Sequence, residues 1–261
     1  MFSRIFVFAC LFVSTFAVAA TTVTPTTTLS AETSNNTSTA ASFTAQSNGN
    51  IGPSNVSKVP TNTLLYNGST TAVYAHFMGW FGPGEPHMSV GYTSSDPAQV
   101  QAQVADATSR GIAGFILDWY GPNNTMPNQT AQVLMTTAQN QQNPDFKFAI
   151  MEDGGALGNC NSTPGCDLSA QIISDLTYAY QTYEGSPAYL TFAGRPAVFF
   201  FDPDRYGTLD WARVTANVPG NPLFIFQNSG GFTHPDSSGS ISWVIINTKD
   251  ANDWGQSYLD G

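Results

Sequence analysis

Polar and aromatic residues gather where short apolar runs of this 261-residue chain end. Paired carboxylates beside aromatic rings suit hydrolysis of glycosidic bonds, in which one carboxyl protonates the leaving oxygen, a second acts as nucleophile or base, and rings stack on sugar faces. A single Asp at a strand end can instead cap the next loop or pair with a buried Arg. The clusters are His76 and Trp80; Asp118, Trp119 and Tyr120; Glu152 and Asp153; Asp202 and Asp204; Gln227 and Asn228.

The alternation of side chains along a strand selects which of these groups face a common barrel mouth. Asp118 shares its parity with Ile116 and Tyr120, and a carboxylate is better placed in a wet mouth than against a helix layer. By the same reasoning we expect the side chains of His76, Glu152 and Asp202 to point inward. We expect Asp153 and Asp204 to be turn residues. The in-chain catalytic candidates are Glu152, Asp118 and Asp202. The substrate-binding candidates are His76, Trp80, Asp118, Trp119, Tyr120, Glu152, Asp202 and Asn228.

Alternating strand and helix patterns must position these residues. The helix that opens at Asp96-Pro97 carries Val100, Val104 and Ala107 on one face, and Gly111 ends it. The other predicted helices span 130–140, 168–183 and 209–218. The predicted strands span 72–78, 114–119, 146–152, 197–202, 223–228 and 242–247.

This order predicts an α/β fold with a parallel sheet, which is either a (β/α)8 TIM-type barrel or a doubly wound sheet. The doubly wound fold usually has a Gly-rich loop leading into a helix after its first strand, and Gly82-Pro83-Gly84 is followed by no helix start. The barrel explains the polar strand ends, because its active sites lie at that face. Since a barrel takes roughly 250 residues, we expect a barrel domain over 63–261 that is truncated after about six strands.

The N-terminus predicts export. Arg4, an apolar run from Ile5 to Val18 and the small residues around Ala19 read as a signal peptide over 1–20, with a signal anchor as the alternative. Residues 21–62, rich in Ser and Thr, read as a disordered linker. A secreted chain should join Cys160 and Cys166 in a disulfide. No zinc-type spacing links His76, His87 and His234, so no metal is expected.

The amino-acid composition limits the classes of ligand that the chain is expected to bind. Only 10% of residues are charged, and the formal net charge of -10 disfavours nucleic acid and anionic membranes. A neutral, hydroxyl-rich ligand such as a polysaccharide or oligosaccharide fits better. The chain has no serine-hydrolase elbow, no HExxH and no phosphate-binding loop, and we expect a monomer without cofactors.

Several segments resemble glycoside hydrolases of families 99 and 71. They are Val73-Tyr74-Ala75-His76-Phe77-Met78, Tyr92-Thr93-Ser94-Ser95-Asp96-Pro97, Gly111 to Tyr120, Phe148-Ala149-Ile150-Met151-Glu152 and Gly194 to Asp202, in the family order within about residues 70–247. The resemblance implies a (β/α)8 enzyme that acts on α-linked mannans or α-1,3-glucans.

The resemblance also implies residue roles. Glu152 matches a glutamate of the sugar-binding cleft, and His76 and Trp119-Tyr120 match positions that line it. Asp118 departs from the family pattern, which has a small residue there. The late motif Trp/Phe-Asn-Glu/Asp-x-x-Glu, which holds the family's catalytic carboxylates, does not occur in this sequence, and its expected place lies beyond Gly261.

Three functions therefore stand open. The first is a secreted endo-acting hydrolase of α-linked polysaccharide, and the second is a carbohydrate-binding barrel protein without catalysis. The third is a complete short enzyme that uses Glu152 with Asp118 or Asp202.

Overall fold

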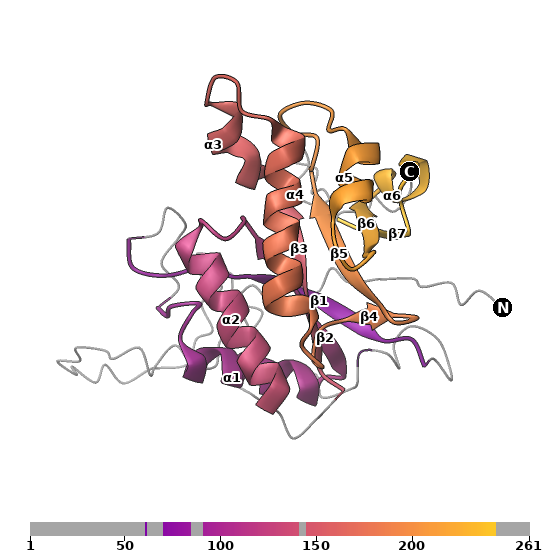
Figure 1. Ribbon diagram of the computed structural model, residues 1–261. Helices are drawn as coiled ribbons and strands as arrows, with labels where there is room; N and C mark the ends of the chain where they lie inside the picture. Colours follow the sequence, from indigo (N-terminus) through magenta and orange to yellow (C-terminus); the bar gives the residue numbers. More distant parts are fainter. Residues whose placement is uncertain (1–60, 62–69, 85–90, 141–144, 244–261) are drawn as a thin grey trace, which may run out of the picture.

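The computed structural model describes residue 61 and residues 70–84, 91–140 and 145–243. Its centre is a parallel sheet whose six strands follow one another in chain order (Figure 1). A short strand, β4 (Thr191–Phe192), pairs antiparallel with β5. The parallel strands are β1 (Val73–Met78), β2 (Ile112–Trp119), β3 (Lys147–Asp153), β5 (Arg195–Phe201), β6 (Leu223–Gln227) and β7 (Gly239–Ile241).

Helices connect the strands and cover one face of the sheet. Three of them begin with an Asp cap, because the side chains of Asp96, Asp167 and Asp210 accept hydrogen bonds from first-turn N–H groups. The α-helices are α1 (Pro97–Ser109), α2 (Thr125–Asn140), α3 (Gly158–Asn161), α4 (Leu168–Ala179), α5 (Trp211–Asn217) and α6 (Gly230–Thr233). The 3-10 turn η5 (Gly154–Leu157) precedes α3, and α4 continues into the π-helical turn η6 (Tyr180–Glu184).

The two faces of the sheet can be told apart by their contacts. Trp119 of β2 stacks on Tyr178 of α4, and Phe200 of β5 packs against Trp211 of α5, so both side chains face the helices. Paired residues of neighbouring parallel strands share a face, and side chains alternate along each strand. Asp118, next to Trp119, therefore lies on the opposite face, which we call the inner face.

The sheet curls around this inner face. Trp243, just after β7, lies with its ring centroid 4.9 Å from that of His76 on β1 and 4.6 Å from that of Phe201 on β5. A residue beside the last described strand thus reaches side chains of the first strand. Such curvature is what a barrel requires.

The predicted fold class is confirmed: a curled arc of six parallel strands alternates with helices, as in a (β/α) barrel. The described strands show no reversal of order, the mark of a doubly wound sheet. Five strand predictions agree with the structure to within a few residues. The sixth is wrong in position, since β7 spans Gly239–Ile241 and precedes Ser242. Residues 244–247 of that prediction lie outside the described part.

Two helices also differ from their predicted bounds. α2 begins at Thr125, five residues before the predicted start, because Pro127 is tolerated in a first turn. α5 is shorter than predicted. The predicted signal peptide and nearly all of the linker lie outside the described residues, although the linker residue Thr61 donates from its N–H and hydroxyl to the Arg110 carbonyl, each at 2.8 Å. Among the described helices, none is long and apolar enough to span a membrane.

Candidate functional site

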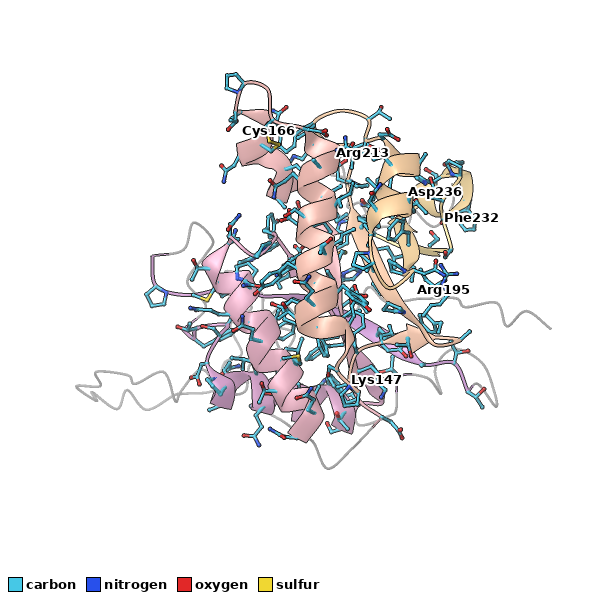
Figure 2. The ribbon with its side chains drawn as sticks, in the orientation of Figure 1. Lys147, Cys166, Arg195, Arg213, Phe232 and Asp236 are labelled. Atoms are coloured by element: carbon cyan, nitrogen blue, oxygen red, sulfur yellow. A yellow bond between two sulfur atoms is a disulfide. The ribbon has the colours of Figure 1, made fainter. Side chains whose placement is uncertain are left out.

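Two carboxyl groups lie on the inner face where neighbouring strands end. Asp118 pairs in register with Met78 and Met151, and Asp153 pairs with Phe201, so both aspartates point away from the helix layer. Both are almost fully buried, with 2% and 3% exposure. Together with the rings around them they form what we call the mouth. Figure 2 labels Lys147 at the start of β3 and Cys166 in the loop beyond its end, at opposite ends of the molecule.

Asp153 is surrounded by donors. Its Oδ2 accepts a hydrogen bond from the Tyr120 hydroxyl at 3.0 Å, and its Oδ1 accepts one from the Gly155 N–H. The pKa of Asp153 is raised above its ordinary value, mainly by burial and further by the Asp202 carboxylate, while these two bonds and the nearby Arg205 guanidinium offset part of the rise. Asp153 is therefore the carboxyl of the mouth that is best prepared to carry a negative charge.

Asp118 has a different environment. Its Oδ1 is buried, and no described residue donates to it. Burial raises the pKa of Asp118 well above its ordinary value, and the nearby Asp153 carboxyl raises this pKa further. Neutral protonated Asp118 beside ionised Asp153 is the arrangement that these surroundings favour, because two carboxylates cannot share a buried site at low cost.

Aromatic rings complete the mouth. The ring centroids of Trp80 and Tyr120 lie 5.8 Å apart, and both residues are only half-buried. His76 is 7% exposed and lies against Trp243; burial lowers the pKa of His76 to about 4, so its ring is neutral near pH 7. The mouth thus offers partly exposed rings, a carboxylate and a carboxylic acid, which are the groups that bind sugar faces and hydroxyls.

Glu152 does not point into this mouth, so its predicted inward orientation is wrong. It pairs with Trp119 on one side and Phe200 on the other, and both of those side chains face helices. Glu152 is 1% exposed, neither of its oxygens has a partner among the described residues, and burial followed by the charge of Asp175 on α4 raises its pKa well above the ordinary value. It is a neutral acid between sheet and helix.

Trp119 also lies behind the sheet, away from the mouth. Its Nε1 donates to Asn128 Oδ1 of α2 at 3.2 Å, while Asn128 Nδ2 donates to the Tyr178 hydroxyl at 3.1 Å. The Tyr183 hydroxyl donates to Asn128 as well. This network fixes α2 and α4 against β2, and it gives Trp119 a packing role.

Asp202 and Asn228 lie at the rim, just past the ends of β5 and β6. Asp202 is exposed, and both residues have positive φ, 46° and 51°. The Asp202 N–H donates to Gln227 Oε1, and Asn228 Oδ1 accepts from the Trp243 N–H at 2.7 Å. Strand alternation does not extend to these two residues, because their positive φ turns the chain at the strand ends. Asp202 lies close enough to Asp153 to raise the pKa of that carboxyl, and Asn228 bonds to Trp243, whose ring lies against His76.

Sequence reasoning missed three members of this region. Asp153 was expected to be a turn residue, and it does cap η5 through Gly155, but its side chain also lies in the mouth. Arg205 comes from a loop that no strand pattern marks, and Trp243 was expected within the strand predicted over 242–247 but lies just after β7. The role of Asp153 depends on its contact with Tyr120, and that contact follows from the register between β2 and β3, which the sequence does not give. Asp204 is a turn residue as expected, since its carboxylate accepts from the Leu209 N–H at 2.9 Å.

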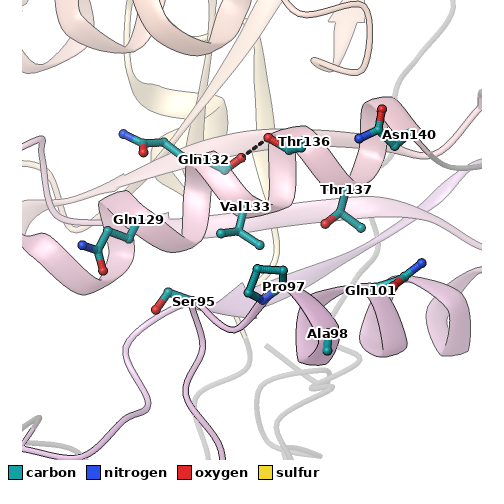
Figure 3. A pocket seen from close by; sticks show the side chains of 10 residues that line it. All are labelled: Ser95, Pro97, Ala98, Gln101, Gln129, Gln132, Val133, Thr136, Thr137 and Asn140. Atoms are coloured by element: carbon teal, nitrogen blue, oxygen red, sulfur yellow. Dashed lines mark hydrogen bonds between the residues drawn. The ribbon is translucent and has the colours of Figure 1, made fainter.

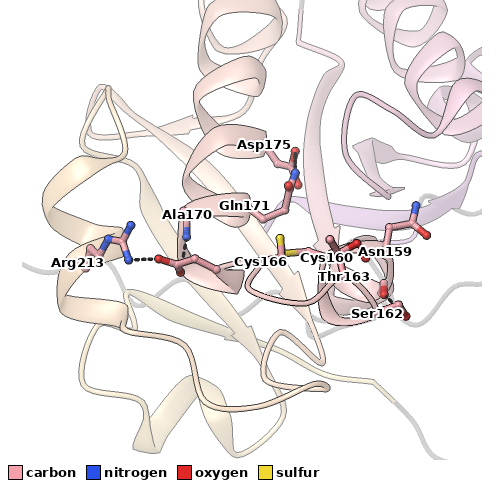
Figure 4. Close-up of a disulfide and its surroundings, with 11 residues drawn as sticks. Asn159, Cys160, Ser162, Thr163, Cys166, Ala170, Gln171, Asp175 and Arg213 are labelled. Carbon is pink, nitrogen blue, oxygen red and sulfur yellow. Dashed lines mark hydrogen bonds and ion pairs between the residues drawn. A yellow bond between two sulfur atoms is a disulfide. The ribbon is translucent and has the colours of Figure 1, made fainter.

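The predicted disulfide is confirmed. Cys160 of α3 and Cys166 are bonded, with their Cα atoms 5.3 Å apart, in the connection between β3 and α4 (Figure 4). Asp167, the next residue, caps α4 and forms an ion pair with Arg213 of α5. The staple therefore anchors the loop that supplies the Gly155 N–H to Asp153.

A separate groove of about 630 Å³ lies between α1 and α2, on the helix layer (Figure 3). It contains none of the predicted site residues. Its lining has amides, hydroxyls and apolar groups but no charged side chain: Ser95, Pro97, Ala98, Gln101, Gln129, Gln132, Val133, Thr136, Thr137 and Asn140. The described residues also contain no group of three His, Cys, Asp or Glu side chains placed to hold a metal ion; His87 lies outside them.

No family model and no curated protein sequence matches the chain. Solved structures do resemble it. A GH99 endo-alpha-mannosidase from Bacteroides thetaiotaomicron in complex with bis-tris-propane has a TM-score of 0.47 and 18% identity, with 62% of this chain and 54% of that chain covered. Another structure of the GH99 endo-alpha-mannosidase from Bacteroides thetaiotaomicron has a TM-score of 0.47 and 13% identity, covering 72% and 67%.

A third structure, described as a glycoside hydrolase-like protein, has a TM-score of 0.47 and 15% identity, covering 65% of this chain and 56% of that one. The chain thus spans only slightly more than half the length of two of these three proteins. The structural neighbours are glycoside hydrolases or similar to them, and the resemblance to family 71 stays a prediction. Sequence identities of 13–18% and TM-scores of 0.47 do not assign a function to this chain.

Proposed function

We propose that this chain binds a neutral α-linked glycan, an α-glucan or α-mannan, in the mouth, as part of a secreted glycoside hydrolase. The observation that carries the proposal is the pair of buried inner-face carboxyls, Asp118 and Asp153, beside the half-buried rings of Trp80 and Tyr120. Rings cover the apolar face of a sugar, and carboxyl oxygens bind its hydroxyls.

Charge supports a neutral ligand. The chain carries a formal net charge of -10, and among the described residues the mouth holds Asp118 and Asp153, with Asp202 close by, against a single nearby cation, Arg205. A phosphorylated or carboxylated ligand would meet repulsion there, whereas a neutral polyol can donate to Asp153. Secretion as a monomer is part of this proposal; the signal-like N-terminus and the Cys160–Cys166 bridge support an oxidising compartment.

Binding and cleavage are separate parts of the proposal. The family resemblance assigns cleavage to a late carboxylate motif that the sequence does not contain, so we assign glycan binding to the mouth. A carbohydrate-binding barrel without hydrolysis is the second candidate, and the buried, hydrogen-bonded state of Asp153 favours it over a third, the short enzyme built on Glu152, which faces the helices.

The test is calorimetric titration with α-1,3-glucan and α-mannan oligosaccharides, accompanied by an assay of reducing ends. We expect binding to one α-linked series, and Trp80→Ala should weaken it about tenfold, because loss of a stacking ring costs on the order of 1.4 kcal/mol. The matched control is Asp145→Asn, an exposed carboxyl before β3 at the opposite end of the sheet.

Each outcome has a clear reading. Binding together with release of reducing ends supports the hydrolase, and binding alone supports the carbohydrate-binding barrel. If neither series binds, or if Trp80→Ala binds as well as Asp145→Asn, the mouth is not a glycan site.

A further inference from the structure

The carboxyls of the mouth have unequal surroundings although they end neighbouring strands. Both oxygens of Asp153 accept a hydrogen bond from a fixed donor, one from the Tyr120 hydroxyl at 3.0 Å and one from the Gly155 backbone. The Oδ1 of Asp118 is equally buried, yet no described group donates to it. A buried polar atom without a partner is costly, so a group that pairs with it is favoured.

We propose, resting on the function above, that the mouth binds its glycan through one hydrogen-bond donor and one hydrogen-bond acceptor. Asp118 stays a neutral acid and donates a hydrogen bond to a sugar oxygen. Asp153 stays a carboxylate and accepts a hydrogen bond from a sugar hydroxyl. Tyr120 is then a positioning residue, since its hydroxyl occupies one lone pair of Asp153 and orients the others. Acetal and hydroxyl oxygens accept hydrogen bonds, and sugar hydroxyls also donate them.

The surrounding charges agree with this division. Among the described residues, the other titratable or charged groups near these two carboxyls are Tyr120, Arg205, His76 and Asp202, while Glu152 lies on the opposite face of the sheet. Asp202 is exposed at the rim, and its charge raises the pKa of Asp153. Arg205 is the only cation of this set and acts on Asp153. Burial, followed by the nearby Asp118 and Asp153 carboxyls, raises the pKa of Tyr120, so its hydroxyl remains a donor to Asp153. His76 is neutral near pH 7 and adds no charge.

The division explains why the two aspartates are not interchangeable. An ionised Asp118 would place a second anion beside Asp153, with no described donor to receive it. A neutral Asp118 can donate a hydrogen bond to a ligand oxygen, and its carbonyl oxygen can accept a second hydrogen bond. A ligand that presents one acceptor and one donor side by side, as neighbouring oxygens of a pyranose do, satisfies both carboxyls at once.

The first test needs no ligand. The carboxyl 13C resonances of aspartates, assigned by comparison of the intact chain with Asp118→Asn and Asp153→Asn, are followed from pH 3 to pH 9. We expect the Asp118 resonance to report the protonated form at pH 7 and the Asp153 resonance the ionised form. Two ionised carboxyls at pH 7, or the reverse assignment, would overturn the division and leave the proposed function intact.

The second test measures glycan affinity, with the oligosaccharide that binds best, at pH values on both sides of the titration of the Asp118 resonance in the first test. Wild-type affinity should fall at least tenfold as Asp118 ionises. Asp118→Asn keeps an N–H donor but cannot titrate, so its affinity should change less than threefold over that range. Asp153→Asn should bind at least tenfold more weakly than Asp145→Asn at every pH, and Tyr120→Phe should lie between them.

The results separate the two proposals. If the NMR titration shows a protonated Asp118 and an ionised Asp153 at pH 7 but no glycan binds, the proposed function is overturned and the protonation states of the two carboxyls stand. Glycan binding whose pH dependence is the same in wild type and Asp118→Asn overturns the donor role of Asp118 while the glycan site stands.

Discussion

Glu184 offers a direct test of the buried charges. It ends the π-helical turn η6, is only 9% exposed, and neither of its carboxyl oxygens has a partner among the described residues. Burial raises its pKa from 4.5 to about 8. We therefore expect Glu184→Gln to stabilise the fold at neutral pH, because the amide has nearly the same shape and never carries the charge.

The sign and size of the effect follow from linkage. Below pH 4.5 both the folded and the unfolded chain are protonated at Glu184, and its contribution to stability is fully present. As the pH rises, the unfolded chain ionises first, so stability falls until the folded group ionises near pH 8. Keeping the proton at pH 7, about 2.5 units above the unfolded value, costs about 3 kcal/mol at about 1.36 kcal/mol per unit.

The assay is denaturant unfolding of wild type and Glu184→Gln at pH 5, 7 and 8.5. The variant should gain little at pH 5, roughly 3 kcal/mol at pH 7 and more at pH 8.5. Asp145→Asn, which replaces another carboxyl by an amide at an exposed position, is the matched control. A gain that is equal at all three pH values would show that Glu184 is ionised in the folded chain, and the argument from its burial would then be refuted.

Three further predictions concern residues behind and beside the mouth. Glu152→Gln should leave glycan affinity within twofold and raise stability at neutral pH, because this side chain faces α4; a tenfold loss of affinity in titration would contradict its placement. Trp119→Phe should lower the free energy of unfolding by about 1–2 kcal/mol through the lost bond to Asn128 while preserving affinity, as urea melts and titration would show. Reducing the Cys160–Cys166 bridge should cost about 2 kcal/mol in the same melts, and an unchanged midpoint would argue against the staple.

The sequence predicted the fold because its signals were local and repeated. Asp96-Pro97 marks a helix start, Val100 and Val104 share one helix face, and continuous apolar runs mark strands that are buried on both faces. Short elements escaped prediction for the converse reason: β4 has two residues, and the π-helical turn η6, in which Tyr183 is buried, continues the apolar spacing of the helix it extends.

Orientation within a strand was harder to predict. Period two separates Glu152 from Asp153 but does not say which of them faces inward, since apolar residues flank both parities of β3. Placing Glu152 inward together with Phe148 and Ile150 gave the wrong face for this residue. The decisive information is the register that pairs Glu152 with Trp119, and register depends on long-range packing that no single segment encodes.

The position of Trp243 has a consequence for the order of folding. Its ring meets His76 of β1 and Phe201 of β5, so contacts between the first and last described strands are among the most distant along the chain. Long-range contacts of this kind carry a large loop-closure entropy and form late. The β1–β2–β3 segment, which already holds Asp118, Tyr120 and Asp153, can pair first. During synthesis, the carboxyl pair would then be in place before Trp243 arrives to cover the inner face beside it.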